Sequence, residues 1–291
     1  MAGAYRRPEA LIETAWLAAH LNDGKLRILD GSFTLPNVHP SGPELYARQH
    51  IPGAVFFDIE EIRDTTNPLP HMLPDEKAFA AAMRHLGIGS EHKIVVYDAF
   101  GLTSAPRVWW TLRVFSHKDV AVLNGGLPKW LAEGRAVTAE IPKFPPATFN
   151  AKLDKSRVRD KAQMLANLKS KREQVIDARS AGRFSGEAPE PRAGLRGGHI
   201  PGSFSLPSDQ LIDKTTRMVL PADALAAKFR AAGLDPAQPA AASCGSGVTA
   251  SALAFGMYLL GWPEPAVYDG SWSEWGLPGD TPVETGAPAA R

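Results

Sequence analysis

The chain has 291 residues, of which 44% are hydrophobic and 22% are charged, and its formal net charge is +1. This length predicts two domains, each large enough to bury a core. The near-zero charge argues against binding to nucleic acid or to an acidic membrane surface, because neither would be attracted. The single cysteine excludes an intramolecular disulfide and a cysteine-based metal cluster.

The first half alternates helical and strand-like patterns. Apolar residues that recur every three or four positions indicate helices, and short runs of β-branched residues indicate strands. The expected helices cover residues 11–20, 77–86 and 104–115, and the expected strands cover 26–29, 93–97 and 120–123. Such alternation predicts an α/β fold with a mainly parallel sheet flanked by helices.

Regularity fades between residues 136 and 157, where Pro142, Pro145 and Pro146 stand in a stretch with no clear period. Proline-rich segments without periodicity are typical of linkers. We therefore expect an N-terminal domain at 1–138, a linker at 139–158 and a C-terminal domain at 159–291.

The second half repeats the first. The motif His-Ile-Pro-Gly occurs at residues 50–53 and again at 199–202, a spacing of 149 residues. Ile-Leu-Asp at 28–30 returns as Val-Ile-Asp at 175–177. A repeat of this length indicates two copies of one α/β domain.

The only cysteine, Cys244, opens the segment Cys-Gly-Ser-Gly-Val-Thr at 244–249. A small-residue run at 238–243 precedes it as a predicted strand, and an apolar run at 251–262 follows as a predicted helix. Backbone N–H groups in a glycine-rich turn before a helix favour an anion, and here the anion can be the thiolate itself. The alternative is a cysteine that is only a small buried hydrophobe. The two glycines favour the anion-binding loop.

The repeat sets Asp98 opposite Cys244, at a spacing of 146 residues. A carboxylate cannot act as a sulfur nucleophile, so we expect only the C-terminal copy to be catalytic. The N-terminal copy then forms either a wall of the site or a folding support, and both possibilities stay open.

Three motifs carry a family resemblance: the two His-Ile-Pro-Gly segments, the cysteine loop, and Asp-Gly-Ser-Trp-Ser-Glu-Trp at 269–275. Together they resemble the tandem-domain rhodanese-type sulfurtransferases over about residues 11–276. Thiosulfate-using members carry two basic residues after the cysteine, whereas Gly245 and Ser246 are neutral. The loop is therefore more similar to that of the mercaptopyruvate-using branch.

The resemblance implies two tandem rhodanese-like domains, of which the C-terminal one is catalytic. The implied reaction moves sulfur from 3-mercaptopyruvate through a Cys244 persulfide to an acceptor and releases pyruvate, without a metal or organic cofactor. The implied acceptors are thioredoxin, a small thiol or cyanide.

The resemblance also assigns roles to single residues. Arg183 and Arg192 would bind the substrate, since arginine grips carboxylates with a charged fork. The loop residues Gly245, Gly247, Val248 and Thr249 would complete the binding site. The alternative for each arginine is an ordinary surface ion pair with Glu187 or Glu190.

Proton transfer in the family implies a serine, a histidine and a carboxylate, which here would be Ser246, His71 and Asp58. Two of the three belong to the N-terminal domain, so this assignment predicts a site at the domain interface. His71 as a plain loop histidine and Asp58 as a turn cap remain the alternative.

Three other functions were weighed against this one. A cysteine-dependent phosphatase needs arginine at the sixth position after the cysteine, and Ala250 stands there. A thiosulfate:cyanide sulfurtransferase differs only in its donor. A non-catalytic sulfur-carrier or interaction module would have no need for Cys244 together with Arg183 and Arg192.

The sequence further predicts a cytoplasmic protein. Its first residues lack the apolar core of a secretory signal, and no uninterrupted apolar run is long enough to span a bilayer.

Overall fold

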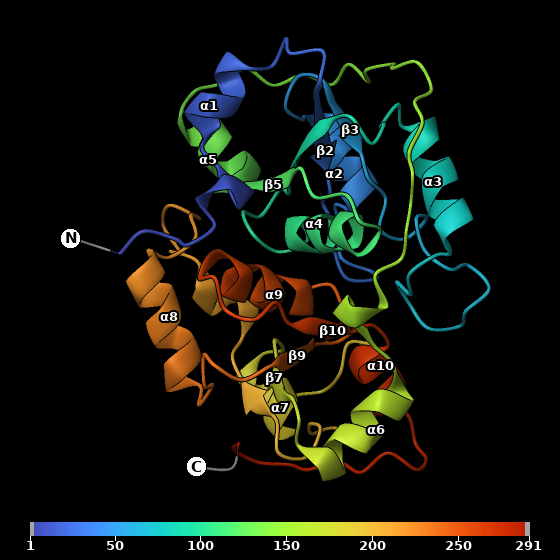
Figure 1. The fold of residues 1–291 in the computed structure, drawn as a ribbon, viewed down its shortest axis with the longest axis vertical. Helices are drawn as coiled ribbons and strands as arrows, with labels where there is room; N and C mark the ends of the chain where they lie inside the picture. Colours follow the sequence, from blue (N-terminus) through green and yellow to red (C-terminus); the bar gives the residue numbers. More distant parts are fainter. Residues whose placement is uncertain (1–2, 289–291) are drawn as a thin grey trace.

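The structure is a computed structural model that describes residues 3–288. It consists of two α/β halves stacked along the long axis, with the N-terminal half at the top of Figure 1 and the C-terminal half below it. Each half contains one five-stranded parallel sheet with helices packed around it. The α/β prediction is confirmed.

The N-terminal sheet has the strand order β1-β5-β4-β2-β3, and all neighbouring strands are parallel. The strands are β1 (Leu11–Ile12), β2 (Leu26–Asp30), β3 (Ala54–Phe56), β4 (Lys93–Tyr97) and β5 (Val120–Leu123). The helices of this half are α1 (Thr14–Ala19), α2 (Gly42–Arg48), α3 (Glu76–His85), α4 (Ala105–Val114) and α5 (Gly126–Ala132), after a short 3-10 turn at Pro8–Ala10.

The C-terminal sheet repeats this arrangement with the order β6-β10-β9-β7-β8, again parallel throughout. Its strands are β6 (Val158–Arg159), β7 (Gln174–Asp177), β8 (Phe204–Ser205), β9 (Ala240–Ser243) and β10 (Ala266–Tyr268). Its helices are α6 (Lys161–Ser170), α7 (Ala181–Ser185), α8 (Ala222–Ala231), α9 (Ala250–Leu259) and α10 (Ser271–Trp275), with 3-10 turns at Lys155–Arg157 and Ser208–Leu211. The predicted repeat is thus confirmed strand by strand.

The start of the chain differs from the expectation of one helix over residues 11–20. Leu11 and Ile12 form the edge strand β1, which pairs with Val122 and Leu123 of β5, and the helix begins only at Thr14. Two adjacent apolar residues fit a strand as well as a helix, and pairing with the sheet edge decides between them. Residues 139–154 contain no helix or strand; the domain limits at 138 and 159 stay predictions.

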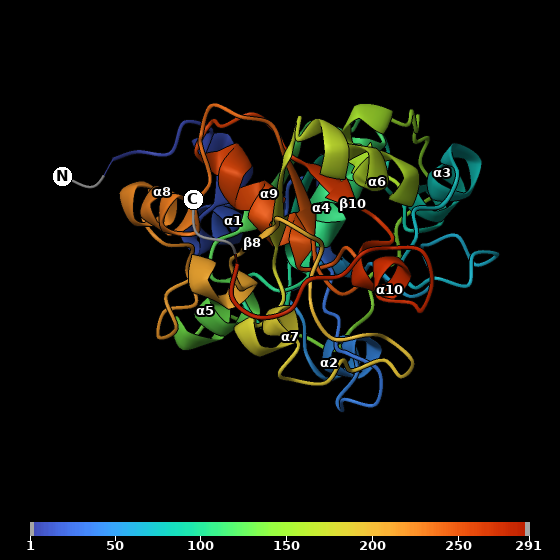
Figure 2. The same cartoon turned by 90° about the horizontal axis from the view of Figure 1, so that it is seen from below.

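Helices α4 and α9 form the joint between the two halves. They pack against each other, and the Trp109 ring of α4 meets the Phe255 ring of α9 edge-on, with 4.9 Å between centroids. Figures 1 and 2 show the two helices adjacent at the centre of the molecule. Nine of the ten residues of each helix are buried. Helices buried on nearly every side require cover from both halves, so each half completes the core of the other.

In the described part of the chain, α9 and every other helix is too short or too polar to cross a membrane.

The carboxylates that end β2 and β7 occupy equivalent positions but have different partners. Asp177 pairs with Arg179 at 2.7 Å. Asp30 is 1% exposed and accepts hydrogen bonds from the backbone N–H of Ser32 at 2.9 Å and from its hydroxyl at 2.5 Å. Burial raises the pKa of Asp30 to about 6.

Substitution of Asp30 by asparagine tests this buried carboxyl. Because its pKa is higher in the folded than in the unfolded chain, its ionised form opposes folding. The wild type should therefore lose stability relative to Asp30→Asn as the pH rises from about 4 through about 6, by up to about 3 kcal/mol. Urea unfolding at about pH 4.5 and about pH 7.5 measures the difference. An equal difference at both pH values contradicts the prediction.

Candidate active site

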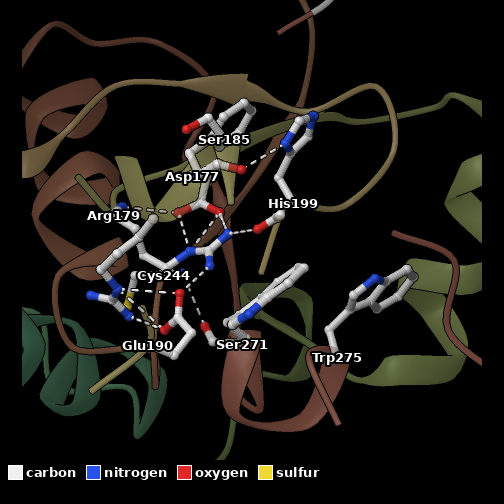
Figure 3. Close-up of polar contacts among 12 residues, drawn as sticks. Asp177, Arg179, Ser185, Glu190, His199, Cys244, Ser271 and Trp275 are labelled. Carbon is white, nitrogen blue, oxygen red and sulfur yellow. Dashed lines mark hydrogen bonds and ion pairs between the residues drawn. The ribbon is translucent and has the colours of Figure 1, made fainter. Parts of the chain in front are cut away.

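Cys244 lies between the end of β9 and the start of α9 and is 2% exposed. Its backbone N–H donates to the Ser271 hydroxyl at 3.2 Å, a contact drawn in Figure 3. The N–H of Trp272 donates to the Cys244 carbonyl at 2.9 Å, and that of Ser273 to the Gly245 carbonyl at 2.8 Å. These hydrogen bonds therefore attach the cysteine loop to the start of α10.

A cleft of about 400 Å³ opens beside Cys244 and receives residues from both halves. The N-terminal half contributes Phe33, Thr34, Leu35, Val38, Phe100 and Thr103. The C-terminal half contributes Arg183, Arg192, Arg217 and the loop residues Cys244, Gly245, Ser246, Val248 and Thr249. Of the two roles left open for the N-terminal domain, the structure places it as a wall of the cleft.

The corresponding loop of the N-terminal half shows what such a loop binds. Asp98 follows β4 as Cys244 follows β9, and its carboxylate is completely buried. It accepts five backbone N–H hydrogen bonds of 2.7–2.8 Å, from residues 100, 101, 103, 104 and 105. The loop geometry of this fold thus surrounds one anion with N–H groups.

At the same spacing of 146 residues, the matching N–H groups of the second loop belong to Ser246, Gly247, Thr249, Ala250 and Ser251. The N–H of Ser251 donates to the Val248 carbonyl at 3.2 Å. The other four belong to the loop and to the first residue of α9, where no preceding turn supplies a carbonyl. An anion attached to Cys244 would meet them as the Asp98 carboxylate meets theirs.

Of the two loop glycines, Gly247 is the one that the backbone requires. It has φ of +78°, and a Cβ there would lie 2.7 Å from the Nη1 atom of the buried Arg107. A Cβ on Gly245 would lie 3.0 Å from the Nη2 atom of Arg183, at the end of a side chain that can shift. Gly245 lines the cleft, whereas Gly247, a predicted binding residue, does not.

Arg183 lies in the cleft but has a carboxylate partner. Its Nη2 donates to Glu190 at 2.6 Å, while Glu190 also accepts from Arg179 at 2.8 Å, and Arg179 pairs with Asp177. Figure 3 shows the Arg179 guanidinium between Asp177 and Glu190. The four charges form a buried alternating chain in which only Arg183, with its side chain 20% exposed, reaches the cleft.

Arg192 is the less compensated cation. Among residues 3–288 its guanidinium has no hydrogen-bond or ion-pair partner, although it lines the cleft. Burial lowers its pKa, and the attraction of Glu60 partly offsets this effect. The alternative of a plain surface ion pair therefore does not describe Arg192, whereas Arg183 does pair with Glu190.

Ser246 and His71 meet across the domain interface. The His71 Nδ1 atom lies 2.8 Å from the Ser246 hydroxyl, and its Nε2 atom lies 3.0 Å from a Glu60 carboxylate oxygen. The His71 bond lowers the pKa of Glu60 and keeps it ionised. An ionised Glu60 accepts a hydrogen from Nε2, which leaves Nδ1 to face the Ser246 hydroxyl.

The expected carboxylate, Asp58, is wrong as the partner of His71. Its Oδ1 accepts from the backbone N–H of Glu60 at 2.9 Å and caps the turn after β3. Its carboxyl is partly desolvated, which raises its pKa. The carboxylate two residues later, Glu60, turns toward His71 instead.

A buried ion pair between the halves anchors the His71 segment. The Arg107 Nη2 atom lies 2.8 Å from Asp269 Oδ1 and donates to the His71 carbonyl at 2.5 Å. The other Asp269 oxygen accepts from the Leu73 N–H at 2.8 Å. His71 has φ of 60°, in the left-handed region, and these two contacts hold it there.

Sequence reasoning missed Glu60, the Arg107 and Asp269 pair, and Arg217. Carboxylates occur at both 58 and 60, and their distances from His71 in the chain do not indicate which of the two contacts the histidine. Arg107 and Asp269 are 162 residues apart and belong to different repeats. Only the packing of α4 against α9 brings them together.

The two tandem α/β domains enclose a cleft in which a cysteine, in an anion-binding loop, faces arginines. This arrangement defines a class of protein suited to chemistry on anionic sulfur compounds. The family described as Rhodanese-like domain matches this chain twice, over residues 13–133 and 160–277. The chain belongs to that family.

Relatives align over most of their length. Thiosulfate sulfurtransferase of Rattus norvegicus is 46% identical over 273 residues, which cover 91% of each chain. The 3-mercaptopyruvate sulfurtransferase of Escherichia coli (strain K12) is 42% identical over 92% of this chain and 95% of its own. The crystal structure of SseA from Escherichia coli, described as a 3-mercaptopyruvate sulfotransferase, superposes with a TM-score of 0.83 at 38% identity, over 91% of this chain and 99% of the other.

Removing one charge of the buried pair tests the anchor of His71. Asp269→Asn is expected to lower the free energy of unfolding by about 3 kcal/mol, because the Arg107 charge is left buried without its partner. The control, Asp280→Asn, removes a carboxylate that is 80% exposed and 3.8 Å from Lys161, and should change stability little. Urea unfolding of both variants checks this, and equal midpoints would contradict it.

Proposed function

We propose that this protein transfers the sulfur of 3-mercaptopyruvate through a Cys244 persulfide to a thiol or cyanide acceptor and releases pyruvate. The Escherichia coli relative carries this donor in its name, whereas the rat relative is named for thiosulfate. Similarity alone therefore supports a sulfurtransferase with either donor, and the argument for the donor comes from the site.

The observation that carries the proposal is the chain from Ser246 through His71 to Glu60 beside Cys244. When sulfur leaves 3-mercaptopyruvate, the electron pair of the carbon–sulfur bond remains on carbon as an enolate. That carbon must take up a proton to give pyruvate, and a hydroxyl poised by an imidazole supplies one. Thiosulfate releases sulfite, which leaves as a stable anion and needs no proton.

Substrate binding falls to the cleft arginines. Arg192 is free to take the donor carboxylate, and Arg183 lies close to Gly245 with one face on Glu190. Together they would hold the carboxylate and the ketone oxygen and direct the donor sulfur toward Cys244. The Cys244 thiolate then attacks that sulfur: a sulfur–sulfur bond forms, the carbon–sulfur bond breaks, and Cys244 keeps the S–H group as a persulfide.

The loop N–H groups then stabilise the product. On losing its proton the persulfide becomes an anion, and by their match to the donors around Asp98 the N–H groups from Ser246 to Ala250 would surround it. The proton that the persulfide loses restores the Ser246 hydroxyl, which became an alkoxide when it protonated the carbon. Glu60 holds the hydrogen on His71 Nε2 and so keeps Nδ1 directed at Ser246.

A thiosulfate:cyanide sulfurtransferase is the second candidate, and the identity of 46% to the rat thiosulfate enzyme favours it. Against it stands the neutral pair Gly245 and Ser246, which provides no side-chain cation at the base of the cleft for a dianion. The identity of the acceptor, thioredoxin or a small thiol, and a cytoplasmic location are part of the proposal.

Parallel assays of the two donors test the reaction. The wild type should release pyruvate from 3-mercaptopyruvate with a reducing thiol much faster than it converts thiosulfate and cyanide. Cys244→Ser should abolish both reactions, because the hydroxyl forms no persulfide. Activity on thiosulfate alone would reject the donor, and activity on neither would favour a non-catalytic sulfur carrier.

Two carboxylate variants separate the roles of Glu60 and Asp58. Glu60→Gln is expected to lower kcat for 3-mercaptopyruvate about tenfold to a hundredfold with little change in KM, because the His71 ring loses the negative charge that orients and polarises it. Asp58→Asn keeps the capping oxygen and should retain nearly full kcat. Steady-state pyruvate release measures both; a larger loss in the Asp58 variant would restore Asp58 as the partner.

A further inference from the structure

Arg217 lines the cleft, yet the reaction described above gives it no task. It belongs to a loop that is tied down at both ends, since Ile212 bridges Val219 and the Val219 N–H donates to Asn124 of the N-terminal half at 2.9 Å. Asp213 closes the loop by accepting the Arg217 N–H at 2.8 Å. The loop therefore presents Arg217 at a defined place.

The backbone of Arg217 is in the left-handed region, with φ of 61°. A residue other than glycine adopts this region only at a cost in free energy, so the surrounding contacts must impose it. In this conformation the Arg217 side chain reaches the N-terminal half. There Nε and Nη2 donate to the Phe100 carbonyl at 2.8 and 2.5 Å.

These two bonds do not neutralise the guanidinium, because a carbonyl carries no net charge. Within residues 3–288 no carboxylate lies within 4.0 Å of Arg217, and its Nη1 atom has no hydrogen-bond partner. Arg217 is only partly buried. A cation with one unused edge thus faces the cleft that contains Cys244.

The cleft has room for a second ligand. Its volume of about 400 Å³ is within the range of pockets that hold drug-sized molecules, whereas the proposed donor has three carbons. Arg183 and Arg192 lie next to Gly245, while Arg217 lies next to Phe100 and Gly101 on the N-terminal side. The two groups of cations therefore serve different parts of the cleft.

We propose that Arg217 binds the carboxylate of a small anionic thiol, which is the acceptor of the sulfur. The inference rests on the proposed function, since it requires a Cys244 persulfide. The acceptor thiolate attacks the outer sulfur of that persulfide, forming a new sulfur–sulfur bond as the bond to Cys244 breaks. Cys244 leaves as the thiolate, and the acceptor carries away the sulfur as its own persulfide.

The test compares 3-mercaptopropionate with its neutral amide, 3-mercaptopropionamide, as acceptors, with 3-mercaptopyruvate as the donor. The wild type should use the carboxylate with a kcat/KM at least tenfold higher, the size of one charge-assisted hydrogen bond. Arg217→Gln should bring the ratio close to one. The control Lys214→Gln removes an exposed charge of the same loop and should leave the ratio unchanged.

Single-turnover release of pyruvate, measured without acceptor, separates this inference from the proposed function. The burst should be equal in the wild type and in Arg217→Gln, because the donor contacts other arginines. No burst in the wild type would reject the proposed function itself. A normal burst with an unchanged acceptor ratio in Arg217→Gln would overturn only the role of Arg217 and leave it as a latch between the halves.

A measurement on the wild type alone covers the case in which the variant does not fold. Propionate, which has the carboxylate but no thiol, should inhibit competitively against 3-mercaptopropionate and not against 3-mercaptopyruvate. Competition against the donor alone would place the anion at Arg183 and Arg192 and overturn the inference.

Discussion

The attraction between an anion and the backbone N–H groups that follow a central strand organises both halves of this protein. In the N-terminal half the anion is the Asp98 carboxylate, which five N–H groups hold in complete burial. In the C-terminal half Cys244 stands at that position, and the proposed anions are its thiolate and its persulfide. The same loop would thus act as a permanent structural contact in one copy and as a reusable binding site in the other.

A second constraint is that the site needs both halves. The cysteine loop and the arginines come from one repeat, whereas His71 and Glu60 come from the other. Their meeting depends on the shared core at α4 and α9 and on the ion pair of Arg107 with Asp269. Because the halves complete each other's apolar surface, the cleft between them is a stable part of the fold, and the contact of Ser246 with His71 across the interface has a fixed geometry.

Charge is distributed unevenly over the cleft. Arg183 closes a buried chain of alternating charges, so it is held rigidly and partly neutralised by Glu190. Arg192 and Arg217 keep their charge toward the cleft, on different sides of it. This separation suits a reaction with two anionic small molecules in succession, one that gives sulfur and one that takes it.

The alternation of strands and helices and the tandem repeat are predictable from the sequence, because they depend on local periodicity and on motifs contiguous in the chain. The sequence pattern also predicts a helix that includes Leu11 and Ile12, because two apolar residues fit either period, and only the edge of β5 decides between them. The sequence likewise does not decide the partner of His71, because Asp58 and Glu60 both carry a carboxylate. The turn after β3 directs Asp58 to the backbone and Glu60 to the imidazole. Sequence alone determined the two repeats and the place of Cys244 in a glycine-rich loop between a strand and a helix. The tertiary structure decided which residues of the two repeats meet, because those contacts join positions more than a hundred residues apart that leave no periodic trace in the chain.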